Sequence, residues 1–160
     1  MKWRKPKPDL PQAAQGEHFI ASTTTVDGRQ LIATDHAFYP DSETRIRWSE
    51  IAKAEWQEPF LTIALLGAAG SPGERLRFDC QESAQNLAAA VHDRVTASVV
   101  ITERVELDGT GTALITARRN RDDDTISWTV LFEAGVDPSD PRIRGQAEQA
   151  LQRLRGSLGI

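Results

Sequence analysis

The stretch QLIATDHAFYPDSETRIRWSEIAKAEW, residues 30–56, decides the fold of this 160-residue chain. Along residues 31–36 every second side chain points to the same face of an extended chain, and the β pattern resumes at residues 45–48. Turn-forming residues separate the two segments. The stretch therefore predicts a strand, a loop, a second strand, a tight corner at Ser49-Glu50 and a third strand.

The flanking segments extend the β pattern. Residues 16–25 are rich in β-branched side chains, and Asp27-Gly28 favours a tight turn that leads into residues 30–56. Two further strands are predicted at residues 60–66 and 75–79, joined by a glycine-rich loop. With the three strands above, the count is six.

A helix is predicted to follow these strands. Ser83 is the expected N-cap, because its hydroxyl can accept a hydrogen bond from a free backbone N–H of the first turn. The apolar stripe has helical spacing and consists of Ala84, Leu87, Ala88, Val91 and Val95. Such a helix can cover the open end of a barrel and remove apolar side chains from water.

The first half of the chain resembles a bacterial PH-like (pleckstrin-homology, GRAM-like) domain, as in uncharacterised actinobacterial proteins. The resemblance rests on the hairpin, the LIATD strand at residues 31–35, RIRWSEI at 45–51, AEW at 54–56 and the closing helix. The resemblance covers residues 16–98 and implies an antiparallel β-barrel or sandwich capped by a helix. The chain departs from the family in its six predicted strands, where the family usually has seven.

Phosphoinositide binding, the best-known activity of such domains, is not carried over by the resemblance. Lipid-binding members place several Lys and Arg side chains around the first hairpin, because a headgroup with several phosphates needs several charge-assisted hydrogen bonds. Here that turn offers only Arg29, beside Asp27.

Residues 99–160 carry a separate pattern. Strands are predicted at 99–107, 112–119 and 125–132, and the last has one apolar face, made of Ile126, Trp128, Val130 and Phe132. A helix follows, with Asp140 as N-cap, Pro141 as the first helical residue and Gly159 as the stop. The sequence predicts an antiparallel β-meander with a C-terminal helix across it, packed on the first half.

The expected fold class is therefore α+β, and four aromatic side chains are expected to anchor the cores. Trp48 and Trp56 alternate with polar residues in predicted strands, which is typical of core positions. Trp128 and Phe132 are expected to be buried against the second helix.

The chain begins with a basic, proline-rich segment, residues 1–15, that we expect to form an arm outside the core. Its candidate binding residues are Trp3, Arg4, Lys5 and Lys7. The formal net charge is −4, but four of the 19 Lys and Arg residues lie in the first seven positions, which leaves 15 basic against 23 acidic residues, or about −8, in the body. An acidic body argues against a nucleic-acid partner.

No catalytic, metal or cofactor site is predicted. A thiol nucleophile with a histidine base would need Cys80 and one of His18, His36 and His92, but no cysteine-centred motif is present. The histidines lack the short spacing of zinc ligands. Residues 122–124, three consecutive aspartates, lack the ligand spacing of an EF-hand, so a solvated turn is expected there.

These patterns predict a non-enzymatic binding or scaffold protein that mediates protein–protein interaction, through a strand added at an exposed sheet edge or a groove beside a helix. A homo-oligomer formed through a sheet edge belongs to the same prediction. Two alternatives remain open, namely peripheral membrane association through the basic arm and a hydrolase with an unrecognised site.

The cytoplasm is the expected compartment. The N-terminus lacks the apolar region of a signal peptide, and Cys80 has no second cysteine with which to form an internal disulfide.

Overall fold

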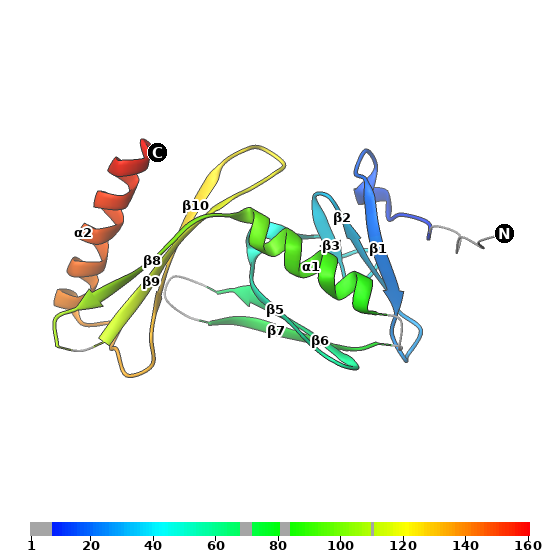
Figure 1. Cartoon of the computed structure of the whole chain (residues 1–160), viewed down its shortest axis with the longest axis horizontal. Coiled ribbons are helices and arrows are strands. Elements are labelled where there is room, and N and C mark those ends of the chain that lie inside the picture. Colours follow the sequence, from blue (N-terminus) through cyan, green and yellow to red (C-terminus); the bar gives the residue numbers. More distant parts are fainter. Residues whose placement is uncertain (1–7, 68–71, 81–83, 110) are drawn as a thin grey trace.

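The computed structural model describes residues 8–67, 72–80, 84–109 and 111–160. Within them the chain forms three antiparallel sheets and two α-helices, which confirms the α+β class (Figure 1). The first sheet joins β1 (Phe19–Thr24), β2 (Gln30–Thr34), β3 (Ala37–Tyr39) and β4 (Ile46–Arg47). The second joins β5 (Ile51–Gln57), β6 (Phe60–Leu66) and β7 (Pro72–Asp79), and the third joins β10 (Ile126–Phe132), β9 (Gly111–Arg119) and β8 (Val99–Leu107).

The sequence predicts one strand from residue 30 to the turn-forming residues 38–42. This is wrong, because the chain reverses after Thr34 and forms two antiparallel strands, β2 and β3. The Thr34 hydroxyl stabilises the reversal by accepting hydrogen bonds from the backbone N–H groups of His36 and Ala37, at 3.2 and 3.1 Å. Among the residues described before the first helix, seven strands therefore form rather than six.

Of the two expected arrangements, a barrel or a sandwich, the closed barrel does not form among the described residues, because their strand pairs leave three separate sheets. One isolated bridge, from Thr25 to Cys80, links the end of β1 to the end of β7. A 3₁₀ turn, Trp48–Glu50, forms the predicted corner between the first and second sheets.

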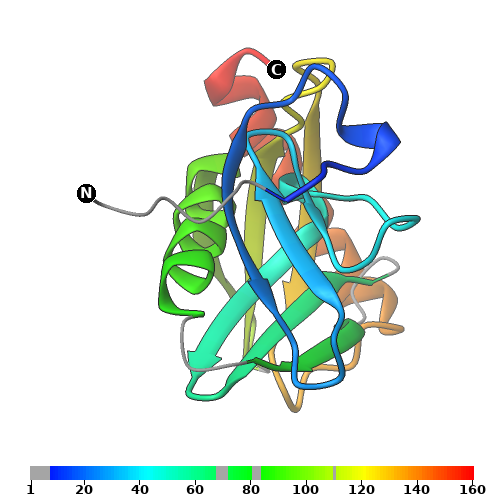
Figure 2. The ribbon, with the colours of Figure 1, turned by 90° about the vertical axis from the view of Figure 1, so that its right-hand side faces the viewer.

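The helix α1 (Gln85–Ser98) lies against the strands of the first half (Figure 2). Its buried side chains Leu87, Val91 and Val95 join one apolar cluster with residues from both sheets. The predicted apolar stripe of this helix is thus confirmed, whereas the predicted N-cap Ser83 lies outside the described residues.

Trp48 and Trp56 belong to the same cluster but differ in depth. Trp48 is 4% exposed, packs 6.4 Å from Phe38 between ring centroids, and donates its indole N–H to the Thr34 carbonyl at 3.1 Å. Trp56 is partly buried at the edge of the cluster.

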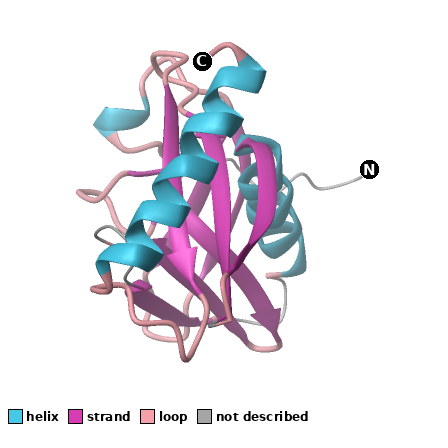
Figure 3. Cartoon of the chain, turned by 90° about the vertical axis from the view of Figure 1, so that its left-hand side faces the viewer, coloured by secondary structure: helices cyan, strands magenta, loops and turns pink. Residues whose placement is uncertain are grey.

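The helix α2 (Pro141–Leu158) crosses one face of the third sheet (Figure 3). Its predicted ends are confirmed: the Asp140 side chain accepts a hydrogen bond from the Arg142 N–H, Pro141 is the first residue, and Gly159 ends the helix at φ 72°. Trp128 packs with Ala150 and Leu154 of α2, and both Trp128 and Phe132 are partly rather than fully buried.

The N-terminal segment meets the core at its described end. Ala14, in a 3₁₀ turn at Gln12–Ala14, is fully buried with Ile32, Ala37 and Tyr39. The candidate binding residues Trp3, Arg4, Lys5 and Lys7 lie outside the described residues. In the part of the chain that the structure describes, neither helix has the combination of length and apolar character that a membrane span requires.

Candidate functional site

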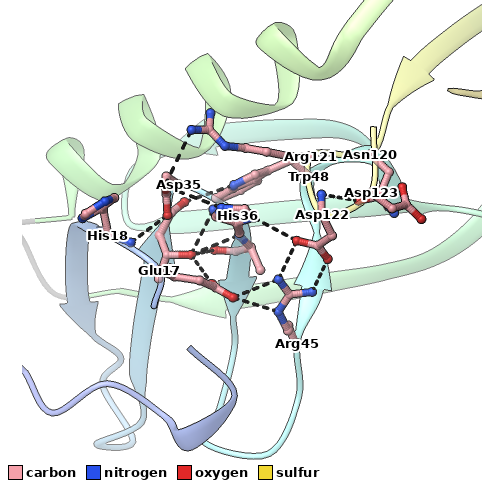
Figure 4. Close-up of polar contacts among 12 residues, drawn as sticks. Glu17, His18, Asp35, His36, Arg45, Trp48, Asn120, Arg121, Asp122 and Asp123 are labelled. Carbon is pink, nitrogen blue, oxygen red and sulfur yellow. Dashed lines mark hydrogen bonds and ion pairs between the residues drawn. The ribbon is translucent and has the colours of Figure 1, made fainter. Parts of the chain in front are cut away.

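A polar network joins the first sheet to the loop between β9 and β10, and Arg45 is at its centre (Figure 4). The Arg45 guanidinium lies between two carboxylates. It donates to Glu17 Oε2 at 2.9 Å, to Asp122 Oδ1 at 2.9 Å and to Asp122 Oδ2 at 2.7 Å. A planar guanidinium matches this arrangement because its N–H groups form a fork.

The carboxylate of Glu17 is enclosed, with its side chain 8% exposed. Its Oε1 accepts hydrogen bonds from the hydroxyls of Thr34, at 2.6 Å, and Tyr39, at 2.9 Å. Burial raises the pKa of Tyr39 to about 12, so this hydroxyl keeps its proton over the physiological range. Both oxygens of the Glu17 carboxylate are therefore satisfied by groups from the first half of the chain and by Arg45.

The β9–β10 loop supplies the other side of the network. Asp122 Oδ1 lies 2.9 Å from His36 Nδ1, and Arg121 Nη2 lies 3.7 Å from Asp35 Oδ2. The side chain of Asn120, itself buried, accepts from the Asp122 backbone N–H at 3.0 Å. Residues 121–123 form the expected turn, and Asp122 is exposed in it, but the Asp122 carboxylate also binds His36 and Arg45 of the first half.

Asp122 makes the network sensitive to acid. The Arg45 guanidinium holds the pKa of Asp122 at about 2, below its ordinary 3.8, so the pair stabilises the fold above pH 4 and the contribution is lost as the pH falls through 2. We expect the free energy of unfolding to drop by about 1 to 2 kcal/mol over that range, allowing for screening of a side chain that is 31% exposed.

Urea unfolding at pH 6, 4, 3 and 2 measures this loss. The variant Asp122→Asn, which cannot titrate, is expected to show a smaller fall than the wild-type chain over pH 4 to 2. Parallel curves for the two proteins would contradict the assignment.

A groove of about 1070 Å³ lies beyond the network, between the two halves of the molecule. The contacts at residues 120–122 fix one end of β9 and β10 against the first half. The groove runs along these two strands and is lined by residues of 114–118 and 128–132. One wall belongs to the second sheet and contains Ala52, Lys53, Ala64, Leu65, Leu66 and Arg75. The other wall belongs to β9, β10 and α2 and contains Thr116, Arg118, Trp128, Leu131, Ala147 and Leu151.

The groove follows the free edge of β10. Trp128 and Val130 face α2, whereas Thr129 and Leu131 face the opposite way, yet all four line the groove. Among the described strands β10 pairs only with β9. The backbone N–H and C=O groups on its outer edge are therefore available to another chain.

The strand β10 itself carries no charged residue. The sequence of β10, ISWTVLF, has no Lys, Arg, Asp, Glu, Pro or Gly, whereas the edge strands β5, β7 and β8 all carry charges. The strand β1 is also uncharged, but α1 packs against it. Natural proteins usually blunt a long edge with charges or proline, so β10 has the character of a pairing surface.

The polar groups of the groove are mainly cationic, although the body of the protein is acidic. Among the described lining residues, four are basic, Lys53, Arg75, Arg118 and Arg144, and one is acidic, Glu148. Lys53 is committed to Glu55, at 2.6 Å. The remaining positive charge favours an anionic ligand over a neutral or cationic one.

The residues considered for catalysis do not come together. Cys80 is buried, which raises the pKa of its thiol, and its hydrogen bond goes to the Phe78 carbonyl rather than to a histidine. His92 is exposed on α1, while His36 belongs to the network. In the described ranges, no three His, Cys, Asp or Glu side chains form a group that would hold a metal ion.

The sequence does not identify the network or the groove, and it singles out His36, Asp122 and Trp128 only for other roles. Glu17 lies in a segment predicted as a strand, Asp122 lies in one predicted as a solvated turn, and Arg118 follows the apolar run of β9. The local sequence gives one signal, the charge of Arg118. In an extended chain Arg118 lies on the same face as Thr116 and Leu114, which are both uncharged.

In comparisons with protein-family models, with curated proteins and with solved structures, no match to this chain was found.

Proposed function

We propose that this chain is a non-enzymatic binding protein, which recognises an extended segment of a partner protein in the groove. The segment adds a strand to β10, so that its backbone pairs with the free edge. The observation that carries the proposal is an uncharged seven-residue edge strand lining a groove of about 1070 Å³. Strand addition of this kind obtains affinity from main-chain hydrogen bonds and specificity from side-chain pockets.

The shape and chemistry of the groove support a peptide ligand. Its volume of about 1070 Å³ slightly exceeds the roughly 300 to 1,000 Å³ typical of small-molecule sites. Side chains from both faces of β10 contact it, as a strand docked at that edge would require, because successive side chains of a strand point to opposite faces. The apolar lining suits apolar side chains of the segment, and the basic groups suit acidic ones.

The assignment of residues 16–98 to the PH-like fold stays part of this proposal. The order of elements supports it, because a four-stranded sheet is followed by a three-stranded sheet and then by a helix. The seven described strands also equal the number that the family usually has, whereas six are predicted from the sequence. Arg29, the one cation of the first turn, forms an ion pair with Asp27 at 3.2 Å, which favours a protein ligand over a phosphoinositide. Cytoplasmic location, membrane association and hydrolysis stay predictions of the sequence.

The edge of β10 is tested with the variant Leu131→Lys. Leu131 is 46% exposed in the groove, and a lysine there puts a charge on the edge, as proteins do to prevent pairing. We expect peptides selected from a displayed library of random 12-residue sequences against the full chain to bind this variant at least tenfold more weakly than the wild type.

The matched control is Val100→Lys, on the opposite edge of the same sheet. Val100 is 41% exposed and does not line the groove, so this variant is expected to bind the same peptides within about twofold of wild type. Equal binding to Leu131→Lys and wild type, or a library that yields no binder, would overturn the proposal. Light scattering measures the oligomeric state. If the wild-type chain is a dimer and Leu131→Lys is a monomer, the segment that pairs with β10 comes from a second copy of this chain and not from a partner protein.

A further inference from the structure

Arg118 is the most deeply buried charged side chain of the groove, with 7% of the residue exposed. It lies on β9, on the sheet face opposite α2, and lines the groove together with Thr116 and Thr129. Burying a guanidinium removes its hydration, which lowers the pKa of Arg118. A buried cation is normally paired with an anion for this reason.

The described part of the chain supplies no such anion. Within the described ranges, the Arg118 side chain makes one hydrogen bond, from Nη1 to the Thr129 hydroxyl at 3.2 Å. Its Nε is buried and has no hydrogen-bond partner among the described residues. A guanidinium has five N–H donors, so most of its capacity is uncommitted.

The guanidinium leans toward the free edge of β10. The residue directly across from Arg118 on β10 is Ser127, but Arg118 bonds to Thr129, two residues farther along β10. The side chain therefore reaches from β9 to the neighbouring strand, β10. Because strands are spaced about 4.8 Å apart, an added strand beyond β10 would place a side chain next to Thr129 within reach of this guanidinium.

We infer that Arg118 is the specificity-determining residue of the groove and binds the side-chain carboxylate of an Asp or Glu in the docked segment, at the position beside Thr129. This inference rests on the proposed function, and it names the chemistry of the partner as an extended, apolar segment with one acidic residue. The Nε–H group is enclosed, but among the described residues no hydrogen bond from Nη2 is found. A carboxylate in the groove can accept hydrogen bonds from the two terminal nitrogens of a guanidinium.

A carboxylate fits this position better than a phosphate does. One arginine balances the single charge of a carboxylate, whereas a phosphate dianion needs several cations. The other basic lining residues lie on different elements, Lys53 on β5, Arg75 on β7 and Arg144 on α2, and Lys53 and Arg75 already face Glu55. The site around Arg118 thus offers one buried positive charge flanked by two threonines.

The test uses peptides selected from the displayed random library against the full chain, synthesised with amidated C-termini so that the only carboxylates are side chains. We expect one acidic position flanked by apolar residues two places away on either side. In the peptide, that Glu or Asp is changed to Gln or Asn, and in the protein Arg118 is changed to Met. Each change alone is expected to weaken binding between tenfold and a hundredfold, measured by fluorescence anisotropy. The two changes together are expected to cost little more than either alone.

Two further variants keep the test sharp. Arg118→Lys keeps the charge without the fork and is expected to bind between the wild type and Arg118→Met. Arg104→Met removes an exposed arginine from β8, on the same sheet but outside the groove, and is expected to bind as the wild type does. Arg118→Met is expected to unfold at the same or a higher temperature than the wild type, because methionine removes an unpaired buried cation.

The outcomes separate this inference from the proposed function. The role of Arg118 is overturned if the selected peptides have no acidic position, or if Arg118→Met binds acidic peptides as tightly as the wild type does. In either case, a loss of peptide affinity in Leu131→Lys still supports strand addition. Acidic peptides that bind Leu131→Lys as tightly as wild type overturn strand addition and the inference with it.

Discussion

Replacing Trp48 by alanine is expected to lower the free energy of unfolding by about 4 kcal/mol, near the upper part of the range for large-to-small core changes. The indole is 4% exposed and packs on Phe38 inside the main apolar cluster. Removing it leaves a cavity that the two sheets and α1 cannot close without moving. The change also leaves the Thr34 carbonyl without the indole N–H that it accepts at 3.1 Å.

The control for Trp48 is Trp56→Ala in the same cluster. Trp56 is only partly buried, so its loss is expected to cost less than about 2 kcal/mol. Urea denaturation of the three proteins measures both differences. Equal losses for the two variants would contradict the distinction between a central and a peripheral tryptophan.

The change Arg45→Met is expected to cost about 3 kcal/mol, because it leaves the Glu17 carboxylate buried without its cation. The control Arg47→Met, two residues away, removes an exposed pair with Glu50, whose side chains are 42% and 44% exposed. That change is expected to cost less than about 1 kcal/mol. A loss at Arg45 no larger than the loss at Arg47 would show that the network is solvated in the native protein.

A double-mutant cycle with Arg45→Met and Asp122→Asn tests whether the network connects the two halves. Each side chain comes from a different half, and their guanidinium–carboxylate contact has two hydrogen bonds. We expect a coupling energy of about 1 kcal/mol or more. Strictly additive losses would mean that the halves are joined by the packing of apolar side chains alone.

Elements whose structure depends on neighbours in the chain could be predicted from the sequence. The α2 caps, Asp140 and Gly159, act through the backbone of the adjacent helix turn, so residue type and position suffice to predict them. The alternation in residues 126–132 likewise places Trp128 on the face that meets α2. These features need no knowledge of distant residues.

Other features depend on contacts that the local sequence does not encode. The reversal between β2 and β3 contains neither glycine nor proline, and it is stabilised by the Thr34 hydroxyl. A threonine inside a β-branched, apolar run favours a continuous strand, so six strands were predicted where seven form. The partner of Arg45 lies 77 residues away, beyond the reach of any local pattern.

The groove was missed for a related reason. The sequence around Arg118 predicts a strand but does not show which face of the strand is buried. Arg118 is buried because the contacts of Asp122 hold the third sheet against the first half. The free edge of β10 is likewise a property of strand order. The uncharged sequence of β10 was visible, but whether the strand lies at an edge or in the middle of a sheet was not.

The order of strands in the three sheets has a consequence for the time course of folding. Every sheet is a meander of consecutive strands, so each hairpin closes a short loop. The contact between Arg45 and Asp122 closes 77 residues, and that costs about 2 kcal/mol more chain entropy than a loop of about eight residues. We therefore infer that the sheets assemble early and that the two halves dock late. Docking is then the step that creates the groove, and nascent chains acquire it only after the third sheet has been synthesised.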